Sequence, residues 1–178
     1  MTCIAGLVDN GRVYMGGDSA GVGNYDLVLR KDPKVFRNGP FLMGFTSSFR
    51  MGQLLRYHFR PPEIKPDDDM DEYLSTAFVD AVRSCLKDGG YARKNNEEEE
   101  GGTFLVGYKD QLYVIESDYQ VGKPLDGFAA IGSGAQIANG ALFATRGLKP
   151  EERVRTALEA AERFNAAVRA PFTILEGP

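Results

Sequence analysis

Apolar and polar residues alternate strongly in the first quarter of the chain, and the alternation predicts two β-hairpins. Residues 2–8 and 12–18 are two β-rich runs separated by Asp9-Asn10-Gly11. Asn-Gly between such runs is a strong hairpin signal, because both residues accept the positive φ of a tight turn. Residues 34–37 and 40–46 repeat this arrangement around a second Asn-Gly dipeptide. Four strands in two hairpins are therefore expected here.

Apolar residues spaced by three and four positions predict helices in consecutive pairs. Residues 48–59 form the first, and the clearest covers 71–88 and ends at a Gly-Gly dipeptide. The apolar stripe of this clearest helix consists of Tyr73, Leu74, Ala77, Phe78, Ala81, Val82, Cys85 and Leu86. Residues 133–146 and 150–169 form the second pair, and the last helix opens with Pro-Glu-Glu, a favourable first turn.

Further strands are predicted at 102–108, 111–116, 126–131 and 171–175. Strands thus come in antiparallel hairpins and helices in pairs. This order fits an α+β fold, a four-layer αββα sandwich with two antiparallel sheets between helix pairs. We expect one domain over residues 1–178, with the first strand buried in the middle.

Composition and charge narrow the class of protein. The chain has 178 residues, of which 43% are hydrophobic and 26% charged, and its net charge is −4. A mildly acidic chain without a Lys/Arg cluster predicts no nucleic-acid partner and no anionic membrane partner. No apolar run approaches the ~18 residues that span a bilayer. Asp9 and Arg12 interrupt the first apolar run, which excludes a signal peptide. We therefore expect a cytoplasmic protein.

Several kinds of site are excluded by the residues that the chain lacks. His58 is the single histidine, and its helical spacing predicts a partly buried structural residue. Cys3 and Cys85 form no CxxC and are interpreted as reduced core residues. One histidine and two distant cysteines leave no transition-metal cluster, and no GxxxxGK[ST] loop is present, so no cofactor is expected.

Two acidic runs are alternative candidate sites. The Asp run 67–69 could bind calcium, but it lacks EF-hand spacing and precedes a helix, where acidic residues are favourable anyway. No metal is therefore expected. The Glu run 97–100 is interpreted as a hairpin tip or a solvated connector.

Without Met1, the chain begins "TCIAGLVDNGRVYMGGDSA". This start resembles the proteasome β-subunit family of N-terminal-nucleophile hydrolases, and most closely the bacterial HslV-type peptidases. The resemblance covers nearly the whole chain and implies an N-terminal-nucleophile hydrolase fold. Its motifs place the catalytic residues at Thr2, at Asp18 in "GGDSA", at Lys34 in "PKVF", at Gly44 in "FLMGFTSS" and at Ser133 in "GSG".

The chemistry of an N-terminal threonine supports these roles. A threonine hydroxyl is a weak nucleophile and needs a base. The α-amine of Thr2 would titrate near 7.7–8.0, close to the operating pH, once Met1 is removed. Lys34 would lower the pKa of that amine and support the developing oxyanion, and Asp18 would hold Lys34. The resemblance makes the Gly44 amide the oxyanion donor.

Each of these residues also has an ordinary structural interpretation. Thr2 could be a strand residue, Asp18 a turn residue, Lys34 a surface charge and Ser133 a helix N-cap. The larger family members carry an Asp and a Ser beside the threonine, after the last helices. The segment "NAAVRAPF" supplies neither, and HslV-type enzymes depart from the family pattern there as well.

The resemblance also implies partners. It implies a homo-oligomeric ring, an unfolded polypeptide substrate and an AAA+ unfoldase ATPase supplied by another chain. Two other functions stay open. One is a proteasome-fold ring subunit that serves as a scaffold or binding module without cutting. The other is hydrolysis of small amides by the same nucleophile, since a fold does not fix its substrate.

Overall fold

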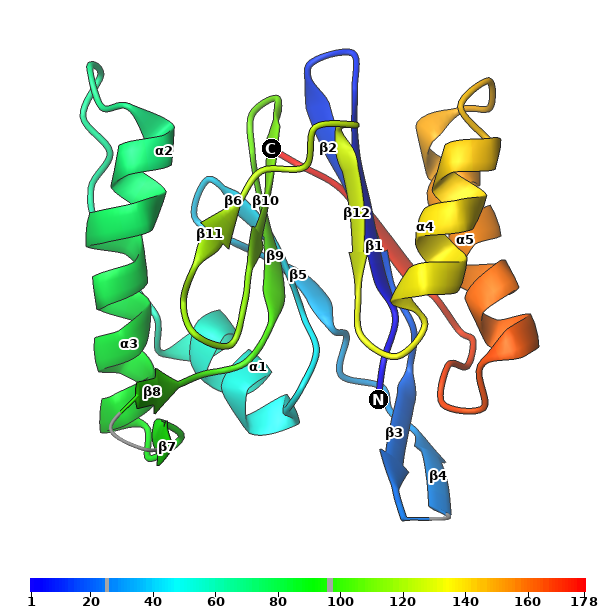
Figure 1. Cartoon of the computed structure of the whole chain (residues 1–178), viewed down its shortest axis with the longest axis horizontal. Coiled ribbons are helices and arrows are strands. Elements are labelled where there is room, and N and C mark those ends of the chain that lie inside the picture. Colours follow the sequence, from blue (N-terminus) through cyan, green and yellow to red (C-terminus); the bar gives the residue numbers. More distant parts are fainter. Residues whose placement is uncertain (25, 96–97) are drawn as a thin grey trace.

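The computed structural model describes residues 1–24, 26–95 and 98–178. Figure 1 shows two sheets face to face, with α2 and α3 covering one outer side and α4 and α5 covering the other. This arrangement confirms the predicted four-layer αββα sandwich. Both sheets are antiparallel throughout.

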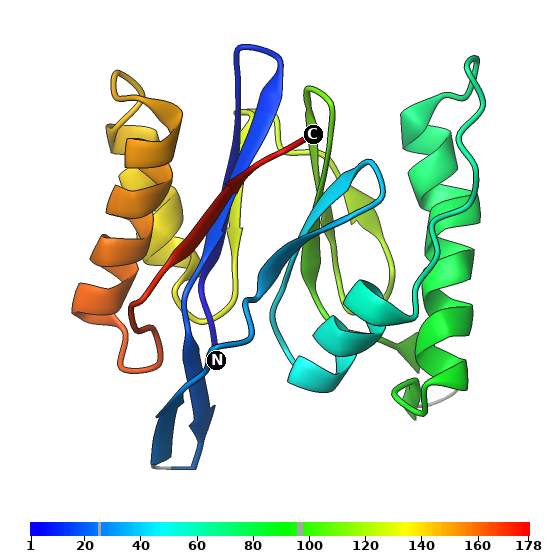
Figure 2. The same ribbon diagram turned by 180° about the vertical axis from the view of Figure 1, so that it is seen from behind.

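The first sheet has the strand order β12-β1-β2-β13. Its strands are β1 (Ile4–Asp9), β2 (Arg12–Gly17), β12 (Phe128–Ile131) and β13 (Thr173–Glu176). Asn10 and Gly11 have φ of 46° and 77°, the left-handed values that a two-residue hairpin turn requires. The first strand lies in the interior of the sheet, as predicted, so the N-terminus enters the middle of the molecule. Figure 2 shows β13 beside β2.

The second sheet has the order β11-β10-β9-β6-β5. Its strands are β5 (Val35–Asn38), β6 (Phe41–Phe45), β9 (Phe104–Tyr108), β10 (Gln111–Ile115) and β11 (Val121–Gly122). The β5–β6 and β9–β10 hairpins are the ones predicted, while the two-residue β11 was not. Strand β6 pairs with β9 and so joins the two hairpins into one sheet.

The helices follow the predicted pairs with different ends. They are α1 (Phe49–Tyr57), α2 (Met70–Tyr73), α3 (Val79–Asp88), α4 (Ala135–Ala144) and α5 (Pro150–Phe164). A π-helical segment, Leu74–Phe78, joins α2 to α3. Helix α5 ends well before the predicted Arg169, because Asn165 is extended and its side chain accepts a hydrogen bond from the Ala167 amide at 2.9 Å.

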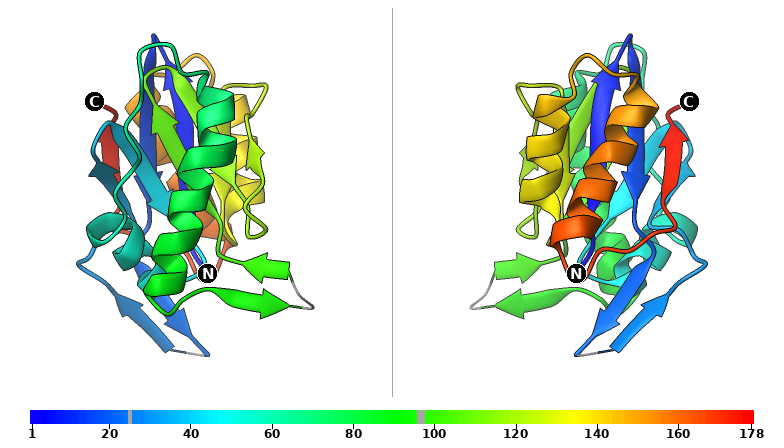
Figure 3. Two further views of the ribbon diagram at one scale, coloured as in Figure 1. Left: turned by 90° about the vertical axis from the view of Figure 1, so that its left-hand side faces the viewer. Right: turned by 90° about the vertical axis from the view of Figure 1, so that its right-hand side faces the viewer.

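Two further hairpins project from the sandwich (Figure 3). Strands β3 (Ala20–Gly23) and β4 (Asp26–Leu29) form one of them, and no strand was predicted there. Strands β7 (Arg93–Asn95) and β8 (Glu98–Glu100) form the other. The glutamate run therefore belongs to a hairpin, although Glu97 itself lies outside the described residues.

The core consists of three apolar layers. The layer between the two sheets includes Ile4, Met15, Val35 and Leu42. A large aromatic-rich layer lies between the second sheet and the helices α1 and α3, and a smaller layer lies between the first sheet and the helices α4 and α5. Ile4 is completely buried, so the residue two positions after Thr2 is anchored between the sheets.

The structure also places the residues of the alternative candidate sites. His58 is the C-cap of α1 and is exposed, so its predicted partial burial was wrong: the apolar contacts of α1 come from Met51, Leu54 and Leu55. Cys3 is buried and Cys85 half-buried, and both are free thiols. Asp69 caps α2, where its side chain accepts hydrogen bonds from two backbone amides.

The structure also bears on metal binding and on membrane spans. Within residues 1–24, 26–95 and 98–178, no group of three or more His, Cys, Asp or Glu side chains could hold a metal ion. None of the helices in that part of the chain is both long enough and apolar enough to cross a bilayer.

Candidate active site

Thr2 lies at the entrance to β1, where the chain passes between the two sheets. Only 5% of Thr2 is exposed, compared with 56% of Met1. The Thr2 amide donates to Ser133 Oγ at 3.3 Å, and the Thr2 carbonyl accepts from the Gly134 amide at 3.3 Å. Ser133 precedes α4, so the start of that helix fixes both backbone groups of Thr2.

Lys34 connects the Thr2 hydroxyl to a carboxylate. Its ammonium donates to Thr2 Oγ1 at 3.0 Å, to Asp18 Oδ1 at 2.7 Å and to the Ala20 carbonyl at 2.7 Å. These three bonds use all three donors of the ammonium. The residue stands directly before β5, and its exposed fraction is 1%. An ammonium that is fully bonded and sealed from water has a fixed position.

Asp18 is the carboxylate that pairs with the Lys34 ammonium. It follows β2, is 2% exposed, and accepts hydrogen bonds from the backbone amides of Cys3 at 3.0 Å, Ala20 at 2.9 Å and Arg169 at 3.3 Å. Together with the Lys34 ammonium, four donors converge on one carboxylate. These bonds join the segment before β1, which carries Thr2, to the segment after α5.

Burial changes the acidity of Lys34. Removal from water disfavours the ammonium and lowers the pKa of Lys34 below its ordinary 10.5, although the Asp18 carboxylate opposes the shift. Burial also raises the pKa of the neighbouring Cys3 thiol to about 12. Cys3 therefore stays a neutral thiol beside the site, while Lys34 releases its proton more readily than a free lysine.

Gly44 is not part of this cluster, in contrast to the prediction. It lies inside β6, where a Cβ atom would stand 2.6 Å from Ile4 Cγ2 and 2.7 Å from Met15 Sδ. The Thr46 amide donates to Thr103, so the alternation of the antiparallel ladder directs the Gly44 amide toward its partner Leu105 on β9. Gly44 therefore permits close sheet packing, and its amide does not face Thr2.

The turn after β6 borders Thr2. Ser47 has a φ of +68° and lines the same small pocket as Thr2. Its Oγ accepts from the Thr103 amide at 3.2 Å. Among the residues that the structure describes, none accepts a hydrogen bond from the Ser47 amide. The sequence "TSS" carried no signal for this conformation, because serine rarely adopts a positive φ.

Asn165 was also missed by the sequence analysis. Its side-chain amide donates to the Ser133 carbonyl at 2.7 Å, and its Oδ1 accepts from Ser133 Oγ at 3.4 Å. It therefore orients the serine that holds the Thr2 amide. The available signal was a lone polar residue at the end of an apolar helical pattern.

Two hollows meet at Met1. A cleft of about 440 Å³ lies on the Ser133 side and includes Thr46, Ser47 and Thr103 among its lining residues. A smaller hollow of about 70 Å³ lies on the other side and is lined by Thr2, Val22, Phe45 and Phe49 among others. The two hollows share Met1, Thr46 and Ser47, and Ser133 lines only the larger one, whereas Thr2 lines only the smaller one.

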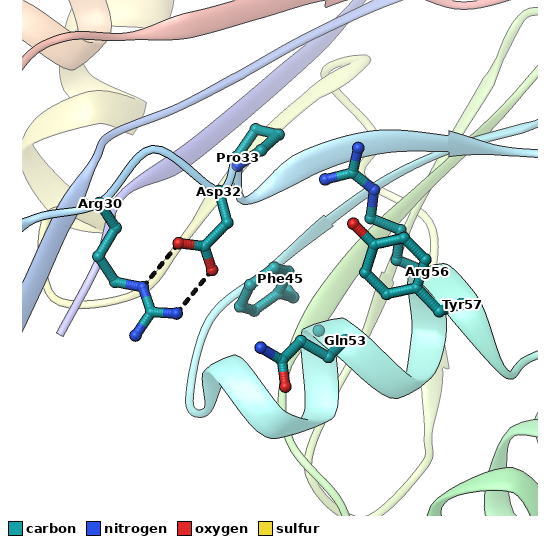
Figure 4. A pocket seen from close by; sticks show the side chains of 8 residues that line it. Arg30, Asp32, Pro33, Phe45, Gln53, Arg56 and Tyr57 are labelled. Atoms are coloured by element: carbon teal, nitrogen blue, oxygen red, sulfur yellow. Dashed lines mark hydrogen bonds and ion pairs between the residues drawn. The ribbon is translucent and has the colours of Figure 1, made fainter.

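A third pocket, of about 180 Å³, lies between α1 and the segment before β5. Figure 4 shows the Arg30 guanidinium bonded to Asp32 through two hydrogen bonds, with Phe45, Gln53 and Arg56 across from them. This pocket shares Phe45 with the hollow beside Thr2, but none of the five predicted catalytic residues lines it. It is therefore not the place of the predicted reaction.

Comparisons with known proteins rest on structure. No protein-family model matches the chain, and no curated protein matches it. The BPH protein of Thiobacillus denitrificans, solved in complex with epoxomicin, is 19% identical with a TM-score of 0.82 over 98% of this chain and 97% of its own. HslV from Trypanosoma brucei is 19% identical with a TM-score of 0.69, over 98% of both chains.

A third similar structure is Anbu, an ancestral beta-subunit from Yersinia bercovieri. It is 12% identical with a TM-score of 0.67, over 99% of this chain and 81% of its own. At identities of 12–19%, the structural similarity to these proteins shows the fold alone. The chain has the proteasome-like and HslV-like fold of the N-terminal-nucleophile hydrolases.

Proposed function

We propose that the chain, once Met1 is removed, is a threonine-type endopeptidase of the N-terminal-nucleophile class. The observation that carries this proposal is the position of the Lys34 ammonium, 3.0 Å from the Thr2 hydroxyl and 2.7 Å from the Asp18 carboxylate. All three side chains are at least nine-tenths buried. A lysine, a threonine and an aspartate sealed together at the start of a chain suit catalysis better than they suit stability.

The reaction follows from the proton acceptors available. Thr2 Oγ attacks the carbonyl carbon of the scissile peptide, and its proton passes to the free α-amine of the same residue. The tetrahedral intermediate then expels the leaving amine, which takes the proton from the Thr2 ammonium. Water hydrolyses the remaining ester with the same amine as base. Lys34 stays protonated and favours the neutral amine by like-charge repulsion.

The oxyanion of the intermediate needs a donor on the side of the β6 turn. We assign this role to the Ser47 amide in place of Gly44, because Ser47 lines the Thr2 pocket and its amide is unpaired among the described residues. A single preorganised amide of this kind contributes about 10²–10³ in rate. Ser133 and Asn165 position the Thr2 amine.

Met1 must be removed for this chemistry. While it is attached, Thr2 N is a peptide nitrogen that cannot accept a proton, and Thr2 Oγ1 donates to the Met1 carbonyl at 2.5 Å. Methionine removal is generally permitted before small residues such as threonine. A chain that keeps Met1 would act only as a non-cutting proteasome-fold ring subunit, which is the second candidate function.

The proposed partners rest on the likeness in fold. We propose a homo-oligomeric ring in the cytoplasm that degrades unfolded polypeptides, with an AAA+ unfoldase supplied by another chain. The sequence contains no phosphate-binding loop, so the chain itself does not couple ATP to unfolding. A stable folded protein should therefore be cut only when an unfoldase and ATP are added.

The test of the proposed function compares Thr2→Ala with Thr2→Ser in chains whose intact mass confirms the loss of Met1. Thr2→Ala should abolish hydrolysis of an unfolded polypeptide and leave assembly intact, while Thr2→Ser should retain part of the rate because it keeps a hydroxyl. Epoxomicin, the compound bound to the Thiobacillus neighbour, serves as a probe: an adduct mapped to Thr2 supports the peptidase. Equal hydrolysis by Thr2→Ala and the unmodified chain would end this proposal.

A further inference from the structure

The substrate segment on the amine side of the scissile bond, called here the leaving segment, can be located from the path of the transferred proton. The expelled amine takes its proton from the Thr2 amine, so the leaving segment of the substrate must pass that nitrogen. Thr2 N lies 3.3 Å from Ser133 Oγ. The leaving segment therefore runs along the side of Thr2 that faces Ser133, and the acyl segment lies on the opposite side.

The cleft of about 440 Å³ lies on this leaving side. Ser133 lines it, as do Gly132, Thr46 and Ser47. These residues come from the end of β12 and from the turn after β6, so both sheets border the cleft. The volume is large enough for more than one side chain, and its walls are predominantly neutral.

Glu116 supplies the charge of this cleft. Among the described residues that line it, Glu116 is the only one with a charged side chain. It stands directly after β10, where its amide donates to the Gln120 carbonyl at 3.1 Å and its carbonyl accepts from the Tyr119 amide at 3.0 Å. Thr103 Oγ1 donates to Glu116 Oε2 at 3.2 Å, which directs the exposed carboxylate toward the start of β9.

The acyl side differs in chemistry. Val22, Phe45 and Phe49 line the hollow of about 70 Å³ there, together with uncharged residues. The Arg30 guanidinium lies 3.8 Å from the centroid of the Phe49 ring, but it does not line the hollow and is paired with Asp32. Among the described residues that line the two hollows, the one charged side chain is therefore on the leaving side.

We infer that Glu116 selects substrates that carry a lysine or arginine in the leaving segment, within the first few residues after the scissile bond. This inference rests on the proposed peptidase function. Because the carboxylate is exposed, the preference is modest and depends on ionic strength. Glu116 contacts the substrate and leaves the proton transfers to Thr2.

The experiment uses the mature, assembled protein and internally quenched peptides that differ only in one leaving-side residue: lysine, glutamine or glutamate. We expect kcat/KM to be about fivefold higher for the lysine peptide than for the glutamate peptide at low salt. The ratio should approach one at about 1 M salt, where the screening length is about 3 Å. Glu116→Gln should bring the low-salt ratio close to one, and Glu116→Lys should invert it.

Asp118→Asn is the matched control. Asp118 lies in the same turn, where its Oδ1 accepts from the Gln120 amide at 3.1 Å, but it does not line the cleft. It should leave the preference unchanged. An equal loss of preference in both variants would assign the effect to overall surface charge and overturn the inference, as would cleavage of all three peptides at the same rate. Failure to cut any peptide would instead count against the proposed function.

Discussion

Among single residues, Lys34 occupies an unusual position for a lysine. Its side chain is 1% exposed, and its ammonium donates to a hydroxyl, a carboxylate and a carbonyl. Breaking a buried ion pair by removing one partner costs about 3–5 kcal/mol, because the other charge is left without its partner. A neutral apolar pair of similar volume would be at least as stable, so the pair is better explained by chemistry than by folding.

The ion pair leads to a prediction for the rate. Lys34→Ala and Asp18→Asn should each lower kcat/KM by at least about 100-fold, because the first removes the ammonium and the second its anionic partner. Lys34→Arg should not restore activity, since the larger guanidinium fork does not fit the three acceptors. The measurement is peptide hydrolysis by assembled protein of verified mass. Normal cleavage by Lys34→Ala would show that Lys34 has a structural role and no catalytic one.

The lowered pKa of Lys34 predicts the alkaline behaviour of the protein. Activity should fall at a pH below the ordinary 10.5, as the ammonium loses its proton. Between the two pKa values the unfolded chain holds the proton that the folded chain has released. The free energy of unfolding should therefore rise with pH in that interval.

A pH profile of kcat/KM and urea unfolding at alkaline pH values up to 10.5 measure these two effects. Lys34→Arg is the control for the second, because a guanidinium keeps its proton throughout the interval. A slope of unfolding free energy that is equal in both proteins would show that another group titrates.

For the individual residues of the site, the sequence was a partial guide to their positions. The structure brings Thr2, Asp18, Lys34 and Ser133 together, although their catalytic roles stay predictions. Gly44 could not be placed, because a glycine in an apolar strand serves close packing and an oxyanion site equally well. The conformation of Ser47 depends on the Thr103 amide, which is distant in the sequence.

Among the elements, β6 sets how closely the two sheets approach. A Cβ on Gly44 would stand 2.6 Å from Ile4 and 2.7 Å from Met15, both on the facing sheet. Gly44→Ala should therefore lower the free energy of unfolding by about 1–3 kcal/mol. Gly140→Ala on α4 is the control, since nothing lies within 4 Å of its added Cβ, and it should stabilise by about 0.5–1 kcal/mol.

Chemical denaturation of both variants tests this pair. If Gly44→Ala were as stable as the parent protein yet inactive, close packing of the sheets would not explain this glycine. Its predicted role as the oxyanion donor would then be favoured again.

The elements that the sequence missed share a physical cause. Strand β4 exposes Leu27, Val28 and Leu29 in succession, so it lacks the alternation that marks a half-buried strand. The end of α5 was placed too late because Val168 continues the apolar spacing, whereas Asn165 leaves the helix to reach Ser133. Both features depend on contacts outside the local pattern.

For the whole molecule, the exposed apolar residues bear on assembly. Leu27, Val28 and Leu29 are 46%, 61% and 55% exposed on a hairpin that projects from the sandwich, and Phe164 is 76% exposed at the end of α5. Apolar surface of this kind is characteristic of contact sites between chains. The hairpin also carries Val22, which lines the hollow beside Thr2, so assembly and the site share one element.

We therefore predict that the purified protein is a ring-sized oligomer at micromolar concentration. Light scattering should give several times the mass of one chain. Val28→Asp should weaken assembly, because it places a charge in an apolar contact. Val8→Asp would be unsuitable as a control, because Val8 packs on the core. Glu159→Lys on the exposed face of α5 is the charge control. A monomer at this concentration would remove the argument for an enclosed chamber.

The burial of the N-terminal strand has a practical consequence for anyone who produces this protein. Thr2 lies between the sheets, whereas the C-terminus emerges at the other end of the sandwich (Figures 1 and 2). An affinity tag, a fluorescent fusion or a display anchor joined to the front of the chain would therefore occupy the cleft beside Thr2. The same additions behind Pro178, which is exposed, leave that cleft open. Protein produced for hydrolysis measurements should therefore carry its label at the C-terminus.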